Sequence, residues 1–237
     1  MRQIVLDTET TGLEPAHGHR IIEIGCVEMV DRQLTGNTFH KYINPETKKV
    51  DQGALEVHGI TDDFLSDKPY FADVYDEFLE FVKGCELIIH NAPFDVGFLN
   101  NEIKLLEKKL AQPLQMVDVS CQILDSLKLA RENHPGQKNN LDALCRRYFI
   151  DNSNRQLHGA LLDSEILADV YLAMTGGQTS LSLDDSADSG ANSETIRRLS
   201  STRAALKVQA PNNEELDAHT EYVAMLEKKS GQSGVWS

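Results

Sequence analysis

The stretch "IVLDTETTG", residues 4–12, joins a short apolar run to two acidic residues. Ile4–Leu6 are typical of a buried strand, and Asp7 and Glu9 stand where that strand gives way to Thr-Thr-Gly. Because alternate residues of a strand share a face, we expect both carboxylates to point the same way. Unpaired buried charge is costly, so such acids normally pair or bind metal. In open α/β sheets, sites are built at this end of a strand.

Strand-like and helix-like patterns alternate from this stretch to about Met174. The predicted strands are residues 2–7, 20–30, 38–44 and 86–91, with a hairpin turn at 34–37 and a final strand at 115–120. The predicted helices are residues 70–84, 94–110, 119–131, 140–148 and 160–174. Strands first, followed by strands alternating with helices, indicate an α/β fold with a mixed sheet flanked by helices.

The character of the chain changes after the predicted catalytic domain, residues 1–175. Gly, Ser, Asp and Ala dominate residues 176–195, which predicts a flexible linker that extends to about residue 212. Residues 213–231 carry apolar side chains at helical spacing, and a single tethered helix cannot bury its own stripe, so we expect it to dock on a partner. Trp236 fits a frayed terminus and a partner anchor equally well.

The composition limits the class of protein. Of the 237 residues, 41% are hydrophobic and 25% are charged, which is ordinary for a globular protein with one sizeable core. No apolar run approaches the ~18–20 residues of a membrane span, and the N-terminus lacks a secretory signal, so we expect a cytoplasmic protein without a membrane partner. Widely spaced Cys26, Cys85, Cys121 and Cys145 are expected to be free thiols.

The net charge of −14 argues against tight, sequence-specific binding of duplex DNA, because phosphate contacts use Lys and Arg. It does not exclude an enzyme that acts on a strand end, since divalent cations held by carboxylates can supply the positive charge.

Two further acids fall on the apolar faces of predicted helices. Asp95 shares a stripe with Phe98 and Leu99, although an acid in the first turn of a helix more often serves as a cap. Asp163 shares a stripe with Leu167 and lies too far into its helix for a cap. His158 precedes it at the expected helix start, where a lone histidine is usually structural.

Taken together, these signals predict one site. Four carboxylates can be buried side by side if they share two divalent cations, and hard oxygen ligands favour Mg²⁺ or Mn²⁺. Two such ions about 3.5–4 Å apart form the clamp that hydrolyses phosphodiesters. His158 is then a candidate general base near neutral pH.

The motifs "DTETTG", "HNAPFDVGFL" and "HGALLD", in this order and spacing, resemble the three exonuclease motifs of the DEDDh (DnaQ-like) 3′→5′ exonucleases. "RIIEIGCVEMV", "NNLDALCRRY" and the tail are similar to the proofreading subunits of bacterial DNA polymerase III. The resemblance implies a ribonuclease-H-like fold and release of 5′-mononucleotides from a DNA 3′ end. It implies metal ligation by Asp7, Glu9, Asp95 and Asp163, with His158 as the base.

The resemblance also implies contacts to substrate and partners. Substrate contacts are implied for Asp7, Glu9, Thr10, His58 and Asp163; Gly53 stands where the family often has a Glu, and Glu56 lies nearby. "QTSLSL" (178–183) resembles peptides that bind the sliding clamp, through Gln178, Leu181 and Leu183. The segment 213–237 with Trp236 is implied to bind the polymerase (alpha) subunit, and some relatives carry a small theta-like subunit.

Two other functions remain compatible with the sequence. An RNA-processing 3′→5′ exoribonuclease would share the fold, although such relatives usually lack a long tail. A non-catalytic replication scaffold would need no active site. The complete set of four acids and a histidine argues against this function.

Overall fold

The computed structural model describes residues 1–153, 155, 157–176 and 210–231 of the chain. The chain divides into two units, residues 1–181 and 182–237. The clamp-like motif at 178–183 and Trp236 lie outside the described residues. None of the helices in the described ranges combines the length and the apolar character that crossing a bilayer requires.

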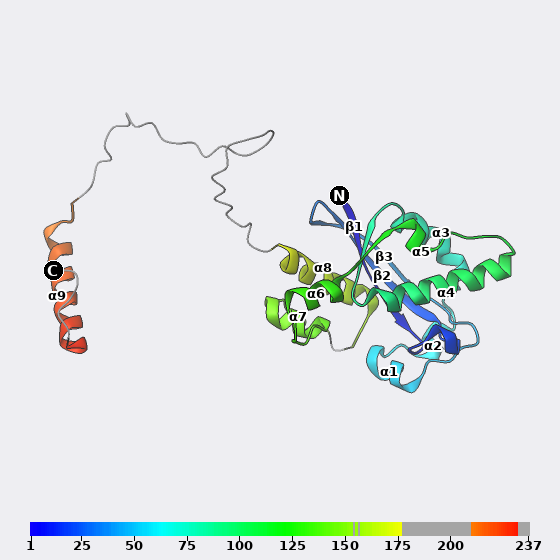
Figure 1. Cartoon of the computed structure of the whole chain (residues 1–237). Helices are drawn as coiled ribbons and strands as arrows, with labels where there is room; N and C mark the ends of the chain where they lie inside the picture. The colour runs from blue at the N-terminus through cyan, green and yellow to red at the C-terminus, as the bar shows by residue number, and fades with distance from the viewer. Residues whose placement is uncertain (154, 156, 177–209, 232–237) are drawn as a thin grey trace, which may run out of the picture. The chain divides into compact units, whose positions relative to one another are not determined.

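A mixed sheet of five strands, in the order β3-β2-β1-β4-β5, forms the centre of the first unit (Figure 1). β1 (Arg2–Thr10), β2 (Ile21–Val30) and β3 (Gln33–Tyr42) are antiparallel neighbours. β4 (Glu86–Ile89) runs parallel to β1, and β5 (Gln122–Asp125) runs parallel to β4. The predicted α/β class with a mixed sheet is confirmed.

Helices cover both faces of this sheet. One apolar cluster includes side chains of α3 (Phe71–Val82) and α4 (Ala92–Leu110). The other includes side chains of α6 (Ser126–Asn133), α7 (Leu141–Tyr148) and α8 (Ala160–Thr175). Shorter elements are η1 (Pro15–His17), α1 (Gln52–His58), α2 (Asp62–Leu65) and α5 (Val117–Ser120), of which η1, α1 and α2 were not predicted.

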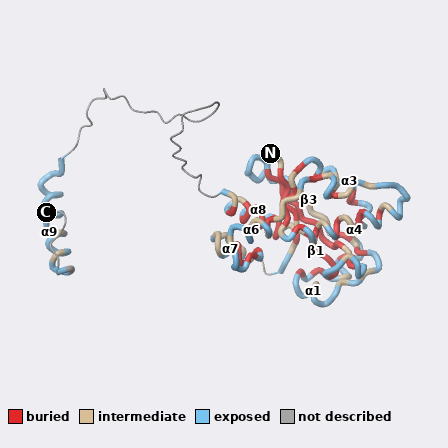
Figure 2. Tube along the Cα trace, in the orientation of Figure 1, coloured by how far each residue is buried: buried red, intermediate tan, exposed pale blue. Residues whose placement is uncertain are grey.

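The central strand β1 is buried on both faces, as the red core in Figure 2 shows. Ile4 and Leu6 belong to the cluster with α3 and α4, whereas Val5 belongs to the cluster with α7 and α8. Because side chains alternate along a strand, Asp7 and Glu9 lie on the Val5 side and face α7 and α8. Dense packing around Ile4–Leu6 therefore fixes the direction of both carboxylates.

A glycine in β2 brings the start of α8 onto the sheet. A Cβ atom at Gly25 would lie 2.2 Å from the backbone of Ala160 and Leu161. Ser164 Oγ donates a hydrogen bond of 2.9 Å to the Gly25 carbonyl. Only a residue without a side chain permits this approach, which sets the depth at which α8 carries Asp163.

The predicted hairpin turn at 34–37 is wrong. β2 and β3 are joined at Asp31 and Arg32, whose φ angles of 49° and 66° are both positive, and β3 begins at Gln33. Two consecutive left-handed residues give the two-residue hairpin whose twist matches the strands. Leu34–Asn37 lie within β3, where Gly36 has a φ of 83° and the register shifts between Val27 and Met29.

The predicted final strand at 115–120 is also wrong. Residues 117–120 form the short helix α5, and the edge strand is β5, inside the range predicted as a helix from 119 to 131. The four residues of β5 are too few to show an alternating pattern, so pairing with β4 decides their conformation. The helix of that range begins only at Ser126.

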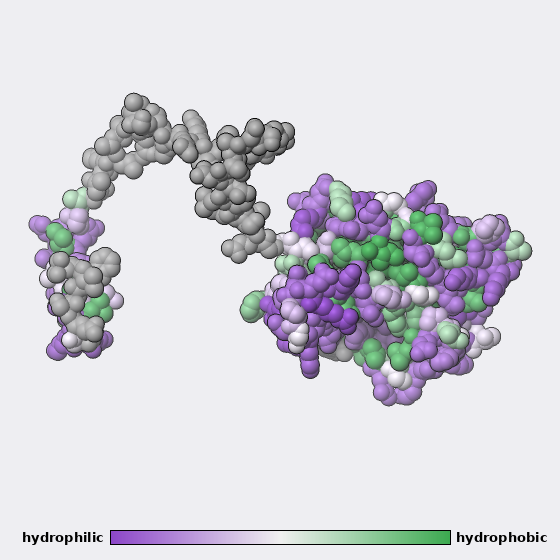
Figure 3. Space-filling model, viewed as in Figure 1, coloured by the Kyte–Doolittle hydropathy of each residue, from purple (hydrophilic) through white to green (hydrophobic). Residues whose placement is uncertain are grey.

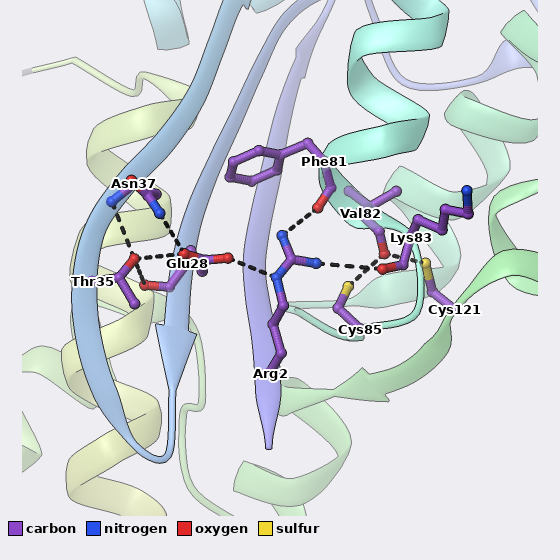
Figure 4. A network of polar contacts seen from close by, with 9 residues as sticks. All are labelled: Arg2, Glu28, Thr35, Asn37, Phe81, Val82, Lys83, Cys85 and Cys121. Atoms are coloured by element: carbon purple, nitrogen blue, oxygen red, sulfur yellow. Dashed lines mark hydrogen bonds and ion pairs between the residues drawn. The ribbon is translucent and has the colours of Figure 1, made fainter.

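The end of β1 opposite the acids is held by a polar network (Figure 4). Arg2 donates to Glu28 on β2 at 2.6 Å and to the Phe81 carbonyl near the end of α3 at 2.6 Å. In the same region, Cys85 and Cys121 both point their Sγ atoms at the Val82 carbonyl, at 2.8 and 3.0 Å. All four cysteines are free, as predicted, and all four are buried.

A buried ion pair joins Arg20, the residue before β2, to α4. Arg20 donates to both carboxylate oxygens of Glu102 at 2.7 Å, and the Glu102 side chain is only 1% exposed. Removing one partner of a buried pair leaves an uncompensated charge. We therefore expect Arg20→Met to lower the free energy of unfolding by roughly 3 kcal/mol, measured by urea denaturation. Arg32→Met, which removes exposed hydrogen bonds only, is the control; equal losses in the two variants would contradict this prediction.

The second unit contains the helix α9 (Asn213–Ser230). Asn212 and Glu215 form a capping box at its start, and Gly231, with a φ of 67°, ends it as predicted. Its apolar side chains Leu216, Tyr222, Met225 and Leu226 are 42–59% exposed.

On the first unit, hydrophilic residues cover most of the face seen in Figure 3, with hydrophobic residues grouped near its middle.

Candidate active site

A cavity of about 330 Å³ opens at the carboxyl end of β1. Asp7 and Glu9 line it from β1, and Asp142 and Asp163 line it from α7 and α8. The full lining is Asp7, Thr8, Glu9, His90, Asn140, Leu141, Asp142, Arg155, His158, Asp163 and Leu167. The cavity thus collects acids from one strand and two helices at the sheet edge where sites are expected.

Glu9, Asp163 and His158 come together in this cavity. One ligand atom of each lies within 4.8 Å of the others. His158 Nδ1 lies 3.1 Å from Asp163 Oδ2, and the imidazole is 43% exposed. Although Asp163 lies in the first turn of α8, its carboxylate accepts hydrogen bonds from Arg155 and does not cap the helix. The structure thus places His158 beside Asp163 and outside the core.

Asp95 reaches the site from α4, through Thr8. Its Oδ1 accepts hydrogen bonds from the Thr8 backbone N–H at 3.1 Å and from the Thr8 hydroxyl at 2.7 Å. The side chain is buried, and no side chain caps α4 at its N-cap Asn91. Of the two roles considered for Asp95, the structure shows the core-facing one. Its charge acts on Asp7, the residue beside Thr8.

Burial and the negative charges of neighbouring acids disfavour the ionised forms of three of these acids. Burial, followed by the charges of Asp95, Glu9 and Asp163, raises the pKa of Asp7 well above its usual value. Burial, followed by the charge of Glu23, raises the pKa of Glu9 to about 8. Burial raises the pKa of Asp95 to about 7, although hydrogen bonds from Thr8 oppose this shift. The site therefore favours positive charge.

Asp163 is the exception among these acids. Burial disfavours its ionised form, but the two hydrogen bonds and the positive charge of Arg155, with His158 close by, outweigh burial and lower its pKa. A guanidinium that bonds to both oxygens of a carboxylate is the strongest of the common ion-pair geometries.

The raised pKa of Glu9 predicts a pH dependence of stability. Between its ordinary pKa of 4.5 and the folded value of about 8, the folded chain binds a proton that the unfolded chain releases. The free energy of unfolding in a chelating buffer should therefore fall as pH rises through this window, by at least about 1 kcal/mol. Urea denaturation at pH 5.5 and 8 measures it. Glu9→Gln should flatten the curve; an unchanged slope in that variant would count against this assignment.

A second cavity, of about 430 Å³, shares Thr8 and Glu9 with the first. Its walls are largely apolar, with Leu13, Ala54, Val57 and Phe94 among them, and Thr10 and His58 also line it. His58 Nδ1 accepts a hydrogen bond of 2.9 Å from the Ile60 N–H, so its Nε2 carries the proton. That Nε2 is buried without a hydrogen-bond partner among the described residues.

Gly53 and Glu56 differ in their relation to this cavity. Gly53 lines it and leaves its wall open, since a Cβ atom there would meet nothing within 4 Å. Glu56 is exposed and accepts a hydrogen bond of 3.0 Å from Gln52 on its own helix. Glu56 is not among the residues that line this cavity.

Five polar residues of the first cavity were not predicted from the sequence: Thr8, His90, Asn140, Asp142 and Arg155. Thr8 and Asp142 have little signal, because a single Thr or first-turn Asp is common. The only signal for Arg155 in the sequence is that it precedes His158 by three residues, and this spacing does not show that its side chain enters the site.

The donor set fits a divalent cation. Carboxylate oxygens from Glu9 and Asp163 lie within reach of one point, and Asp7 shares their cavity. Burial and neighbouring negative charges raise the pKa values of Asp7 and Glu9, so a bound cation would stabilise their ionised forms. Hard cations prefer such oxygen ligands.

Comparison with known proteins identifies the family. The RNase_T family model, described as "Exonuclease", matches residues 4–171. The DNA polymerase III subunit epsilon of Salmonella typhimurium is 52% identical, over 99% of this chain and 97% of that protein. The chain belongs to the DNA polymerase III epsilon-subunit family. The epsilon subunit of Escherichia coli K12 is 50% identical over the same shares.

Solved structures agree with the epsilon family's exonuclease fold. Exonuclease X, in complex with 5′ overhanging duplex DNA, has a TM-score of 0.56 and 26% identity, over 74% of this chain and 94% of that one. The nuclease domain of 3′hExo, a DEDDh family member bound to rAMP, has a TM-score of 0.61 at 21% identity, over 73% and 90%. The fold is therefore the ribonuclease-H-like one, and the chain is a 3′→5′ exonuclease of the proofreading type.

Proposed function

We propose that this chain hydrolyses the 3′-terminal phosphodiester of DNA during replication and releases 5′-mononucleotides. The observation that supports this most is the meeting of Glu9, Asp163 and His158 within 4.8 Å, in a cavity that Asp7 shares. A cluster of acids with one exposed histidine suits a phosphodiesterase that uses divalent metals.

Asp7, Glu9, Asp95 and Asp163 are proposed to hold two Mg²⁺ or Mn²⁺ ions. When bound, such ions stabilise the charge that grows on the phosphate and on the leaving oxygen. The protein's part is to present the ligands in one geometry: the buried strand β1 fixes Asp7 and Glu9, and Thr8 fixes Asp95.

His158 is proposed as the general base. Asp163 lies against its Nδ1, at 3.1 Å, so Nε2 is the nitrogen that remains for the proton of the attacking water. A carboxylate that accepts from Nδ1–H orients the ring and stabilises the imidazolium that forms. The 43% exposure of the ring allows the proton to pass to solvent.

The apolar second cavity is proposed to receive the terminal nucleotide. Its walls suit a base, and Glu9 and Thr8 line both cavities, so a nucleotide there would place its phosphate beside the acids. His58, through its free Nε2–H, and Thr10 are the proposed polar contacts. Asp7 and Asp163 would contact the phosphate side of the substrate.

The partners are proposed from the tail. Residues 178–183 would bind the sliding clamp through Gln178, Leu181 and Leu183. The segment 213–237 would bind the polymerase subunit, for which the exposed apolar side chains of α9 and Trp236 are suited. We also propose that the chain between these two segments is a linker and that a theta-like subunit binds the catalytic domain. The proposed location is cytoplasmic and associated with the replisome.

The deciding experiment is digestion of 5′-labelled single-stranded DNA, with and without Mg²⁺, beside an RNA of the same sequence. We expect stepwise shortening from the 3′ end on DNA only when metal is present. Faster digestion of RNA would favour the exoribonuclease alternative, and no digestion at all would favour the scaffold. Deleting residues 176–237 should preserve catalysis and abolish polymerase binding; loss of catalysis would contradict the proposed division of the chain.

A further inference from the structure

Arg155 contacts Asp142, His158 and Asp163 in the first cavity, although the proposed function assigns it no role. Its Nε lies 2.5 Å from Asp163 Oδ1, and one terminal nitrogen lies 2.6 Å from Asp163 Oδ2. The same nitrogen lies 2.8 Å from His158 Nδ1, and the other lies 2.7 Å from Asp142 Oδ1. The Arg155 side chain is only 7% exposed, so the guanidinium is seated inside the site.

The first consequence concerns Asp163. Both of its oxygens accept hydrogen bonds from one guanidinium. A divalent cation on these same oxygens would stand beside a full positive charge in a buried setting, where repulsion is strong. Arg155 in this position and a divalent cation on Asp163 therefore disfavour each other.

The second consequence concerns His158. A guanidinium has only donors, so its contact with His158 Nδ1 requires a lone pair on that nitrogen. A neutral imidazole with a lone pair on Nδ1 carries its proton on Nε2, and such a ring cannot accept another proton at Nε2. Donation from Nδ1–H to Asp163, which the base needs, becomes available when the guanidinium withdraws.

We propose that Arg155 is a displaceable counter-ion that competes with divalent cations for Asp163 and holds His158 in the tautomer that is inactive as a base. Asp142 is 43% exposed at the side of the cavity and bonds to the other terminal nitrogen, so it can retain the guanidinium after it leaves Asp163. The inference rests on the proposed metal site. It makes Arg155 a positioning residue that couples cation binding to the state of the base.

The test is Mn²⁺ binding to the full chain, measured by isothermal titration calorimetry at pH 7.5. Arg155→Met keeps the length of the side chain and removes its charge and donors. We expect this variant to bind Mn²⁺ about tenfold more tightly than the unmodified chain and to melt at a lower temperature in a chelating buffer. Arg32→Met, at the other end of α8, should change neither value.

A second readout follows the histidine itself. In ¹⁵N-labelled protein without added metal, the His158 Nε2 signal should be that of a protonated nitrogen in the unmodified chain and in Arg155→Lys. In Arg155→Met it should shift toward that of an unprotonated nitrogen. A role of Arg155 in packing alone would move the melting temperature and leave this signal unchanged.

The outcomes distinguish failure of the proposed metal site from failure of the proposed competition by Arg155. If Asp163→Asn binds Mn²⁺ as the unmodified chain does, the proposed metal site fails, and the inference fails with it. If Asp163→Asn loses binding but Arg155→Met binds Mn²⁺ equally or more weakly, the metal site stands and the competition is refuted. Should Arg155→Met fail to fold, Arg155→Lys replaces it in the titration: a point charge that cannot bond to both Asp163 oxygens should also bind Mn²⁺ more tightly, and unchanged affinity would overturn the inference.

Discussion

Asp7→Asn is expected to lower the rate of 3′-end hydrolysis by about a thousandfold or more while leaving the fold at least as stable. The rate falls because the proposed cations supply several kcal/mol to the transition state, and each 1.4 kcal/mol is worth a factor of ten. Stability is maintained because burial, together with the charges of Asp95, Glu9 and Asp163, raises the pKa of Asp7 and disfavours its ionised form. An amide removes that repulsion and keeps the shape of the side chain.

This combination of effects distinguishes a functional acid from a structural one. A structural acid would lose stability when neutralised, because its partners would be left buried and unpaired. The measurements are single-turnover rates on labelled DNA and urea denaturation in a chelating buffer. Asp118→Asn, on the exposed side of α5, is the control and should alter neither. A substantial rate in Asp7→Asn would remove Asp7 from the proposed metal site.

His158→Gln is expected to lower kcat by about 10²–10⁴ with little change in Mn²⁺ affinity. General bases contribute factors of this size, and glutamine retains a polar group beside Asp163 without accepting a proton near neutral pH. Because His158 Nδ1 lies 3.1 Å from Asp163 and within the same small group as Glu9, a ligand role is the direct alternative. Titration with Mn²⁺ separates the two roles.

The pH profile gives an independent check on the base. The rate of the unmodified chain should rise with pH as the imidazole loses its proton, and this rise should be absent in His158→Gln. His17→Gln changes an exposed histidine on η1 and should reproduce the unmodified profile. A loss of Mn²⁺ affinity that parallels the loss of rate in His158→Gln would make His158 a ligand and leave the base unassigned.

The sequence predicted the parts of this fold that carry strong local patterns. The apolar run before Asp7, the helical stripes around Asp95 and Asp163 and the glycine after α9 all lie where the patterns put them. Each of these elements combines a regular spacing of apolar residues with a residue type that marks its end. Neighbouring residues are therefore enough to specify it. The meeting of Glu9 with Asp163 could be inferred because buried acids need a shared partner.

Features that depend on distant residues could not be predicted in this way. β5 is a strand because β4 lies beside it, and its four residues carry no period of their own. The hairpin turn at Asp31 and Arg32 places two non-glycine residues at positive φ. Residues 34–37, which contain a glycine, carry the stronger sequence signal for a turn, so the turn was predicted there. The position of Arg155 depends on three side chains, Asp142, His158 and Asp163, which only the folded chain brings together.

The close approach at Gly25 has a consequence for replication fidelity. Gly25 touches neither cavity, yet any side chain there would push the backbone of Ala160 and Leu161 outward and carry Asp163 with it. A cell that relies on this proofreader would then copy its genome with more uncorrected errors, although every acid of the site is intact. The set of positions where substitution raises the mutation rate therefore extends to the sheet residues that seat α8, and inspecting the active site alone would underestimate it.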